Sequence, residues 1–268
     1  MKDSLRQLIA DRDGALPKRC LVREYLQARA LQSLQESHAF LCWVFHGGTA
    51  LRFLHALPRF SEDLDFSLLP EPASVGFRPT LEAARAVFEA ENYAVDVKIN
   101  DRKMVHSAFL RFRGLPHDLG LSPHESETLS IRVELDTNPP RGADFETTLT
   151  RRHVTLNLVH HDKASLLAGK LHAVLARTYT KGRDLYDLIW FLADRSWPEP
   201  NLPFLNAALR QTEWDGPELT PENWRPVVAG AAERTDWKRA AEDVRPFLER
   251  GADLDLLTRE NCLTLLRP

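Results

Sequence analysis

Two aspartates, Asp63 and Asp65, have the residue type and spacing that best suit chemistry. They lie in the segment 63–68 (DLDFSL), where charged and apolar residues alternate as in a strand with one polar face. Side chains at positions i and i+2 of a strand emerge on the same face, which places these carboxylates about 6–7 Å apart. Carboxylate oxygens are the ligands that Mg²⁺ prefers. A pair of metals held there could clamp the attacking and leaving oxygens of a phosphoryl displacement.

A third carboxylate is expected from a neighbouring strand. The segment 129–136 ends in IRVELD and alternates in the same way. Glu134 lies on one face of that strand, and Asp136 returns to the same face two residues later. Either acid could complete the site with Asp63 and Asp65.

A glycine turn precedes the acidic pair. The apolar run 40–45 reads as a buried strand, Gly47 and Gly48 end it, and a short helix is expected over 49–57. Glycines let the backbone approach a ligand closely, and the start of a helix favours a phosphate. Thr49 adds a hydroxyl donor.

Each of these motifs alone has an ordinary structural explanation. With 38 acidic residues in the chain, an Asp-x-Asp pair is expected by chance, and Gly-Gly after an apolar run is usually a turn. The order favours a function: a strand, a glycine turn, a helix, an acidic pair and then another acidic strand.

A basic stretch follows between residues 151 and 183. It holds seven lysines and arginines against one acid, Asp162. Lys163, Lys170 and Arg177 are seven residues apart, so they form one stripe along the helix expected over 161–177. A solvated helix face is the ordinary interpretation. Opposite an acidic metal site, the same cations could hold nucleotide phosphates or an RNA backbone.

These segments predict an α+β fold with two domains. Helices are also expected over 20–38, 80–91 and 183–193, and strands over 93–99 and 105–113. We place an α+β domain at residues 1–155 and a helical domain at 156–268. The first should contain a small mixed sheet flanked by helices.

Composition excludes several classes of protein. The 268 residues are 43% hydrophobic and 27% charged with a formal net charge of −3, which is typical of a globular chain. The apolar runs are too short to span a bilayer, and the charged start lacks the core of a signal peptide. Three scattered cysteines indicate a reducing compartment. We therefore expect a cytoplasmic protein that does not enter the membrane.

Two separated stretches resemble one known family. GGTAL and RFSEDLDF near residues 47–66, followed by KASLLAGKLHAVLART and KGRDLYDLIWFL within 163–192, are similar to nucleotidyltransferase toxins of the AbiEii/AbiGii type. That family includes the MenT toxins and belongs to the DNA polymerase β-like nucleotidyltransferase superfamily. The resemblance implies a nucleotidyltransferase sheet in residues 1–155.

The resemblance also implies roles for the first group of residues. Gly47, Gly48 and Thr49 would form the turn that binds the nucleotide phosphates. Asp63 and Asp65 would bind metal.

The resemblance also implies roles for residues from 134 onward. Glu134 would be the third metal-binding acid, with Asp136 as its competitor. Lys170 would meet the triphosphate, with Lys163 as its rival. Asp184 would be the acid that follows, and Asp187 lies one helical turn on; a plain helix-start pair is the structural alternative for these two.

The implied activity moves a nucleoside monophosphate from an NTP to an acceptor hydroxyl with Mg²⁺ or Mn²⁺. By resemblance the acceptor is the 3′ end of tRNA, which would block translation and require a cognate antitoxin. One alternative is a transferase of the same superfamily that acts on a small molecule or a protein hydroxyl. Another is an inactive module that binds nucleotide or RNA.

Overall fold

The fold consists of two compact units that alternate along the sequence. The computed structural model describes residues 2–69, 75–179 and 181–267. Unit 1 comprises Met1–Ala56, Phe60–Asn138 and Thr147–His160, and unit 2 comprises Leu57–Arg59, Pro139–Glu146 and His161–Pro268. The domain boundary expected after residue 155 stays a prediction.

Unit 1 is built on a mixed sheet of seven strands in the described part of the chain. Their order is β3-β4-β5-β2-β1-β7-β6. Strand β2 pairs parallel with β5 and antiparallel with β1, while β4 pairs antiparallel with both β3 and β5. The strands are β1 (Trp43–His46), β2 (Asp63–Leu68), β3 (Val95–Asn100), β4 (Val105–Arg113), β5 (Thr128–Asp136), β6 (Phe145–Arg151) and β7 (Thr155–His161).

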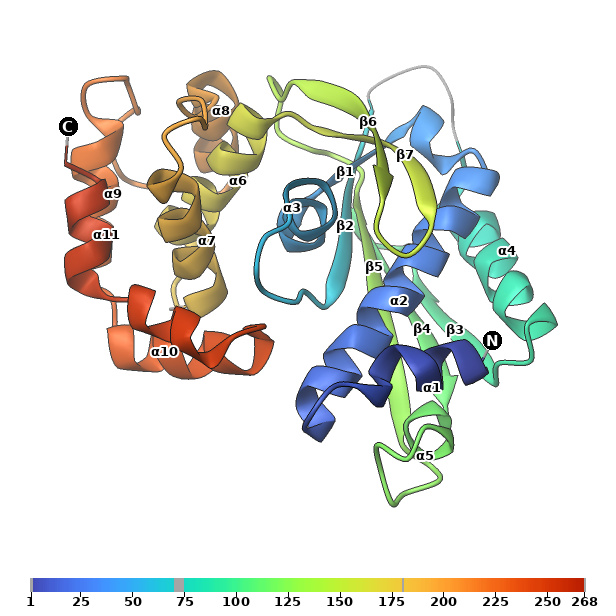
Figure 1. Cartoon of the computed structure of the whole chain (residues 1–268). Helices are drawn as coiled ribbons and strands as arrows, with labels where there is room; N and C mark the ends of the chain where they lie inside the picture. The colour runs from blue at the N-terminus through green and yellow to red at the C-terminus, as the bar shows by residue number, and fades with distance from the viewer. Residues whose placement is uncertain (1, 70–74, 180, 268) are drawn as a thin grey trace. The chain divides into compact units, whose positions relative to one another are not determined.

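Helices cover the apolar face of this sheet. The long helix α2 packs against α4 and β5, and α4 packs against β3 and β4, as Figure 1 shows. The sheet side chains on this face include Leu64, Phe66, Val133 and Leu110, all buried. The helical elements of unit 1 are α1 (Lys2–Ala10), α2 (Ala15–Glu36), η1 (Ala39–Leu41), α3 (Gly47–His55), α4 (Phe77–Ala90) and α5 (Leu115–Asp118).

The sequence predicted many of these elements, but several differ. The run 40–45 is not one strand, because Ala39–Leu41 forms a 3₁₀ turn after His38 adopts a left-handed backbone conformation. Strand β1 therefore starts only at Trp43. Strands β6 and β7 were not predicted from the sequence, although β7 alternates and buries Leu156 and Leu158. The helix expected from residue 161 begins at Lys163, because His161 ends β7.

Unit 2 is largely helical, and its residues after 162 contain no strand in the described part of the chain. Helix α6 packs against α7, α8 and α9, and α7 also packs against α10 and α11. The elements are α6 (Lys163–Ala176), α7 (Gly182–Ala193), α8 (Leu202–Gln211), α9 (Trp224–Glu233), α10 (Trp237–Val244), η2 (Arg245–Phe247), η3 (Gly251–Leu256) and α11 (Arg259–Leu265). The expected α+β sheet followed by a helical region is confirmed.

None of the helices described is both long and apolar enough to cross a bilayer.

Candidate active site

The junction of β1 and α3 places Asp65 against a glycine. Gly47 begins α3 with a φ of 78°, a backbone conformation that favours glycine. A side chain at position 47 would collide with Asp65, since its Cβ would lie 3.1 Å from Cγ of Asp65 and nearer still to a carboxylate oxygen. The Asp65 carboxylate therefore lies beside the first turn of α3. Unpaired N–H groups and the positive end of the helix dipole favour negative charge there.

The predicted acidic face forms in unit 1. Asp63 and Asp65 are half-buried in β2 and alternate with the buried residues Leu64 and Phe66. Strands β2 and β5 run parallel, with Asp65 opposite Glu134. Side chains at paired positions lie on one face, and the strands are about 4.8 Å apart. The sheet register thus brings Asp63, Asp65 and Glu134 to the same face.

Glu134 and Asp136 occupy different places on this face. Glu134 is the direct partner of Asp65, whereas Asp136 pairs with Ser67, one step further along the strands. Glu134 also forms a 2.7 Å ion pair with Arg132. The register thus favours Glu134 over Asp136 as the third acid, and Arg132 competes for its carboxylate.

Gly48 and Thr49 are buried in the first turn of α3. The Thr49 hydroxyl donates a 2.5 Å hydrogen bond to the backbone carbonyl of Asp63. Its proton is therefore used to hold α3 on β2, next to the acidic pair. Phosphate contacts at this turn would come from backbone N–H groups.

The donor chemistry of this face fits a divalent cation. Mg²⁺ takes oxygen ligands and commonly binds through one or two carboxylates, with substrate oxygens completing its shell. Asp63, Asp65 and Glu134 supply oxygens only. Within the residues that the structure describes, no group of three His, Cys, Asp or Glu side chains is already arranged as a metal cage. Two aspartates that share the metal with substrate phosphates are consistent with this arrangement.

Unit 2 holds the other predicted site residues in a buried charge network. The Lys170 ammonium lies 3.0 Å from Asp184 and 2.8 Å from Asp187. Arg59 donates two hydrogen bonds to Asp187, of 2.6 and 2.5 Å. Asp187 is 0% exposed, and Lys170 is only 12% exposed. The network thus pairs two buried carboxylates with cations from distant parts of the sequence.

The pKa shifts of Lys170 and Asp184 favour their charged forms. Burial opposes the charge of Lys170, but Asp187 and Asp184 raise its pKa above the usual value. Burial likewise opposes ionisation of Asp184, but Lys170 and Arg177 lower its pKa. Each charge therefore depends on its partner, since an unpaired buried ion would be neutralised.

The predicted basic stripe divides along α6. Lys163, the first residue of the helix, has its ammonium 4.9 Å from the centre of the Trp197 ring. Lys170 and Arg177 both reach Asp184, the latter at 3.1 Å. The structure therefore brings Lys170, and not Lys163, to the aspartates of the RDLYD motif.

Arg59 is the residue of this network that sequence reasoning missed as a site residue. It lies 128 residues from Asp187, and its exposed fraction is 2%. The only available signal was its place at the start of the quoted RFSEDLDF stretch. A long-range ion pair cannot be recognised from local periodicity.

The chain is similar to one described protein family and to solved structures. The family described as nucleotidyl transferase AbiEii toxin, type IV TA system, matches residues 29–259. Two crystal structures from Helicobacter pylori are similar to the chain, each with 19% identity and a TM-score of 0.49. One is a proposed nucleotidyltransferase, matched over 93% of this chain and 98% of that one; the other is JHP933, matched over 91% and 94%. No curated protein matches the chain.

Proposed function

Because the chain belongs to the AbiEii nucleotidyl transferase toxin family of type IV toxin–antitoxin systems, we propose that it transfers a nucleoside monophosphate from an NTP to the 3′ end of tRNA. The observation that carries this proposal is the packing of Asp65 against Gly47, with Glu134 beside Asp65 in the sheet. This arrangement places a helix start that could bind phosphate next to a row of carboxylates.

The reaction exchanges a phosphoanhydride bond of the NTP for a phosphodiester bond to the acceptor. The acceptor hydroxyl oxygen bonds to the α-phosphorus, the bond between that phosphorus and the oxygen bridging to the β-phosphate breaks, and pyrophosphate leaves. The hydroxyl proton passes to solvent. The backbone N–H groups at the start of α3 orient the phosphates, and the Thr49 hydrogen bond keeps that turn next to Asp63.

Asp63, Asp65 and Glu134 would hold Mg²⁺ or Mn²⁺. A bound divalent cation supplies Lewis-acid stabilisation of the charge that develops in phosphoryl transfer. Lys170, whose charge is maintained by Asp187 and Asp184, would offset the charge of the triphosphate. Lys163 remains a less favoured candidate for this contact because it lies against Trp197.

The biological consequence would be a block in translation. A tRNA extended at its 3′ end cannot be aminoacylated in the normal way. A protein with this activity must be neutralised in its own cell, and the type IV toxin–antitoxin family implies an antitoxin partner.

The deciding experiment supplies each labelled NTP in turn with Mg²⁺ or Mn²⁺ and resolves the products by length. Total tRNA, a protein mixture and small hydroxyl compounds serve as separate acceptors. We expect label on tRNA only. Label on protein or on a small molecule, with none on tRNA, would contradict the proposed acceptor.

Two matched variants test the assignment of the carboxylates. Asp63→Asn should reduce transfer by at least a hundredfold while leaving the thermal unfolding temperature nearly unchanged, since Asp63 is half-buried on the polar face. Asp255→Asn makes the same change at an exposed position in η3 and should retain full activity. Equal activity in the two variants would remove Asp63 from the site.

A further inference from the structure

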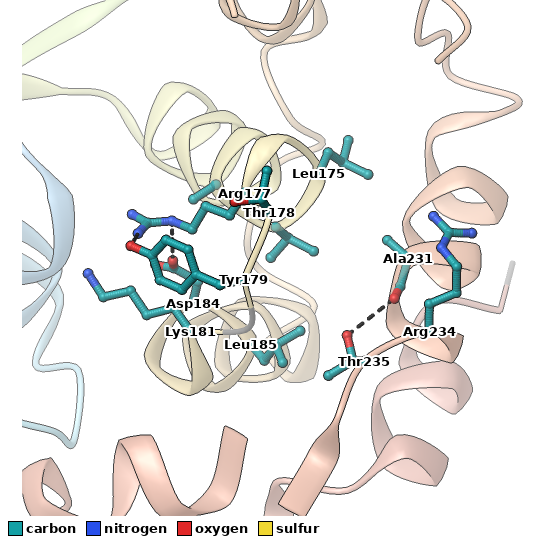
Figure 2. Close-up of a pocket in the computed structure, with 12 residues that line it drawn as sticks. Leu175, Arg177, Thr178, Tyr179, Lys181, Asp184, Leu185, Ala231, Arg234 and Thr235 are labelled. Carbon is teal, nitrogen blue, oxygen red and sulfur yellow. Dashed lines mark hydrogen bonds and ion pairs between the residues drawn. The ribbon is translucent and has the colours of Figure 1, made fainter. Parts of the chain in front are cut away.

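A cavity of about 280 Å³ opens in unit 2 next to Asp184. It is lined by the last turn of α6, residues 177–179 and 181, the start of α7, and the end of α9 with the two residues that follow it. Figure 2 shows Arg177, Tyr179 and Lys181 on one side of the cavity and Arg234 on the other. Its volume is close to the lower bound of about 300 Å³ for small-ligand sites, so it has room for about one nucleotide.

The lining of the cavity carries an excess of positive charge. Three of its side chains are the cations Arg177, Lys181 and Arg234, and its one acid is Asp184. That acid is already paired with Lys170 and Arg177. Within the described residues, Arg234 forms no ion pair, and its side chain is exposed. The lining therefore has cationic groups available for an anion.

The protonation behaviour of Lys181 is consistent with this excess. Burial lowers its pKa, and the neighbouring cations Arg183, Arg177 and Lys170 lower it further, against the opposing effect of Asp184. An anion in the cavity would relieve this repulsion.

Tyr179 offers an aromatic surface at the same cavity. Its side chain is 56% exposed, which is unusual for an aromatic residue that only packs. Arg177 donates a 2.9 Å hydrogen bond to the Tyr179 hydroxyl, and its guanidinium carbon lies 5.7 Å from the centre of the ring. These two contacts hold the ring in place before any ligand arrives.

We propose that this cavity binds the end of a single-stranded RNA, with phosphates on Lys181 and Arg234 and a base stacked on Tyr179. Cations that follow the backbone together with an exposed aromatic ring are the features by which proteins bind single strands. The inference rests on the proposed function, in which RNA is the acceptor, and it adds where unit 2 holds that acceptor.

The lining favours an RNA end over a metal-bound NTP. A triphosphate with its Mg²⁺ needs carboxylates for the metal, and the single acid here is already in two ion pairs. The cations also lie on opposite walls, as Figure 2 shows, which suits successive phosphodiesters better than one triphosphate. Phosphodiesters carry one charge each and require no bound metal.

Binding can be measured without catalysis by fluorescence anisotropy of a fluorescein-labelled single-stranded octaribonucleotide. Tyr179→Ala should weaken RNA binding about tenfold, whereas Tyr179→Phe keeps the ring and should stay within about twofold. Arg234→Gln should weaken binding about threefold and reduce the slope of log K against log salt by about 0.7. Arg239→Gln, which changes an exposed arginine outside the cavity, is the matched control and should bind normally.

A fluorescent ATP analogue with Mg²⁺ provides the second arm. We expect Tyr179→Ala and Arg234→Gln to bind it as the unchanged protein does. Loss of ATP binding with normal RNA binding would overturn the proposal, as would normal RNA binding in both variants or no RNA binding by the full chain.

The proposed function can fail separately from this inference. Asp63→Asn should still bind the octaribonucleotide with unchanged affinity. If the cavity variants lose RNA affinity as expected but the protein adds no nucleotide to tRNA, the RNA site stands and the transfer reaction is wrong.

Discussion

At the scale of single residues, position 47 determines where the Asp65 carboxylate can lie. Gly47 has a positive φ, and a Cβ there would overlap the carboxylate of Asp65. The residue is thus constrained twice, by its backbone conformation and by a side chain that the proposed reaction needs.

Gly47→Ala should therefore remove activity and also lower stability. We expect the free energy of unfolding to fall by about 1–3 kcal/mol because of the strained φ and the displaced carboxylate. Transfer activity should fall at least a hundredfold, as measured with labelled NTP and tRNA. Gly169→Ala is the matched control, since position 169 lies in α6 with open space around it. It should stabilise the protein by about 1 kcal/mol and retain activity; normal activity in Gly47→Ala would contradict our interpretation.

Replacing Asp187 should destabilise the protein. Asp187 is fully buried between Lys170 and Arg59, so Asp187→Ala would leave two buried cations without their main partner. We expect a loss of about 3–5 kcal/mol in unfolding free energy, measured by chemical denaturation.

A double variant tests whether the loss of stability in Asp187→Ala comes from the buried cation that is left unpaired. Arg59→Met combined with Asp187→Leu removes both partners and should recover part of the lost stability, because apolar pairs often replace buried ion pairs without loss. A double variant less stable than Asp187→Ala would show that the pair itself is the main source of stability.

At the residue scale, the sequence predicted which acids lie on the polar faces of the strands, but not which residues they contact. The alternation in 63–68 and 129–136 was enough to place Asp63, Asp65 and Glu134 on polar faces. The packing of Asp65 on Gly47 and the pairing of Arg59 with Asp187 depend on tertiary structure. No local pattern contains that information.

At the scale of elements, α2 is tied to the rest of unit 1 through one buried carboxylate. Glu24 forms ion pairs with Arg52 of α3 at 2.5 Å and with Arg152 of the β6–β7 turn at 2.9 Å, and a 2.9 Å hydrogen bond with His153 of the same turn. Burial alone would raise the pKa of Glu24, but His153, Arg52 and Arg152 together lower it to about 2. This group therefore couples three elements while it is ionised.

Stability should fall in acid as Glu24 becomes protonated. Its pKa is lowered on folding, so its contribution is present above the unfolded value near 4.5 and is lost as pH falls toward 2. The shift corresponds to on the order of 3 kcal/mol. Glu24→Gln should lower the unfolding temperature at pH 7 and flatten its dependence on pH between 5 and 2, as measured by calorimetry. An unchanged pH profile would contradict this role.

Elements were predictable where periodicity is strong and uniform. The segment 105–113 matches β4, and 183–193 differs from α7 by one residue. The apolar run 40–45 was misleading because apolarity does not distinguish a strand from a 3₁₀ turn, and Leu41 is in fact exposed. Strand β6 was not predicted because its side chains are mostly exposed and its sequence shows no regular alternation of apolar residues.

At the scale of the whole molecule, unit 2 is assembled from three separate stretches of sequence. Besides the segment from His161 onward, it includes Leu57–Arg59 and Pro139–Glu146. The first stretch supplies Arg59, and in the second the Gly142 carbonyl accepts a 2.8 Å hydrogen bond from Asn201. Both short stretches thus make specific contacts with the helices.

A fragment of residues 161–268 should not fold as unit 2 does in the full chain. It lacks Arg59 and therefore leaves Asp187 and Asp184 with fewer cations in a buried site. We expect reduced helical content and no cooperative thermal transition by circular dichroism, while the full chain shows one. A fragment that melts cooperatively at the temperature of the full chain would show that the two short stretches are dispensable.

The distance in sequence between Arg59 and Asp187 has a consequence during synthesis. The two residues are 128 positions apart, and ribosomes add about 5–20 residues per second, so roughly 6–25 s pass before the arginine can meet its partner. A nascent chain that has reached residue 162 already carries the carboxylates of β2 and β5 but lacks α6, which bears Lys170, and everything after it. Under the proposed function, a product that stops before α6 would lack Lys170 and should not transfer nucleotides, so only chains translated past α6 would require the antitoxin.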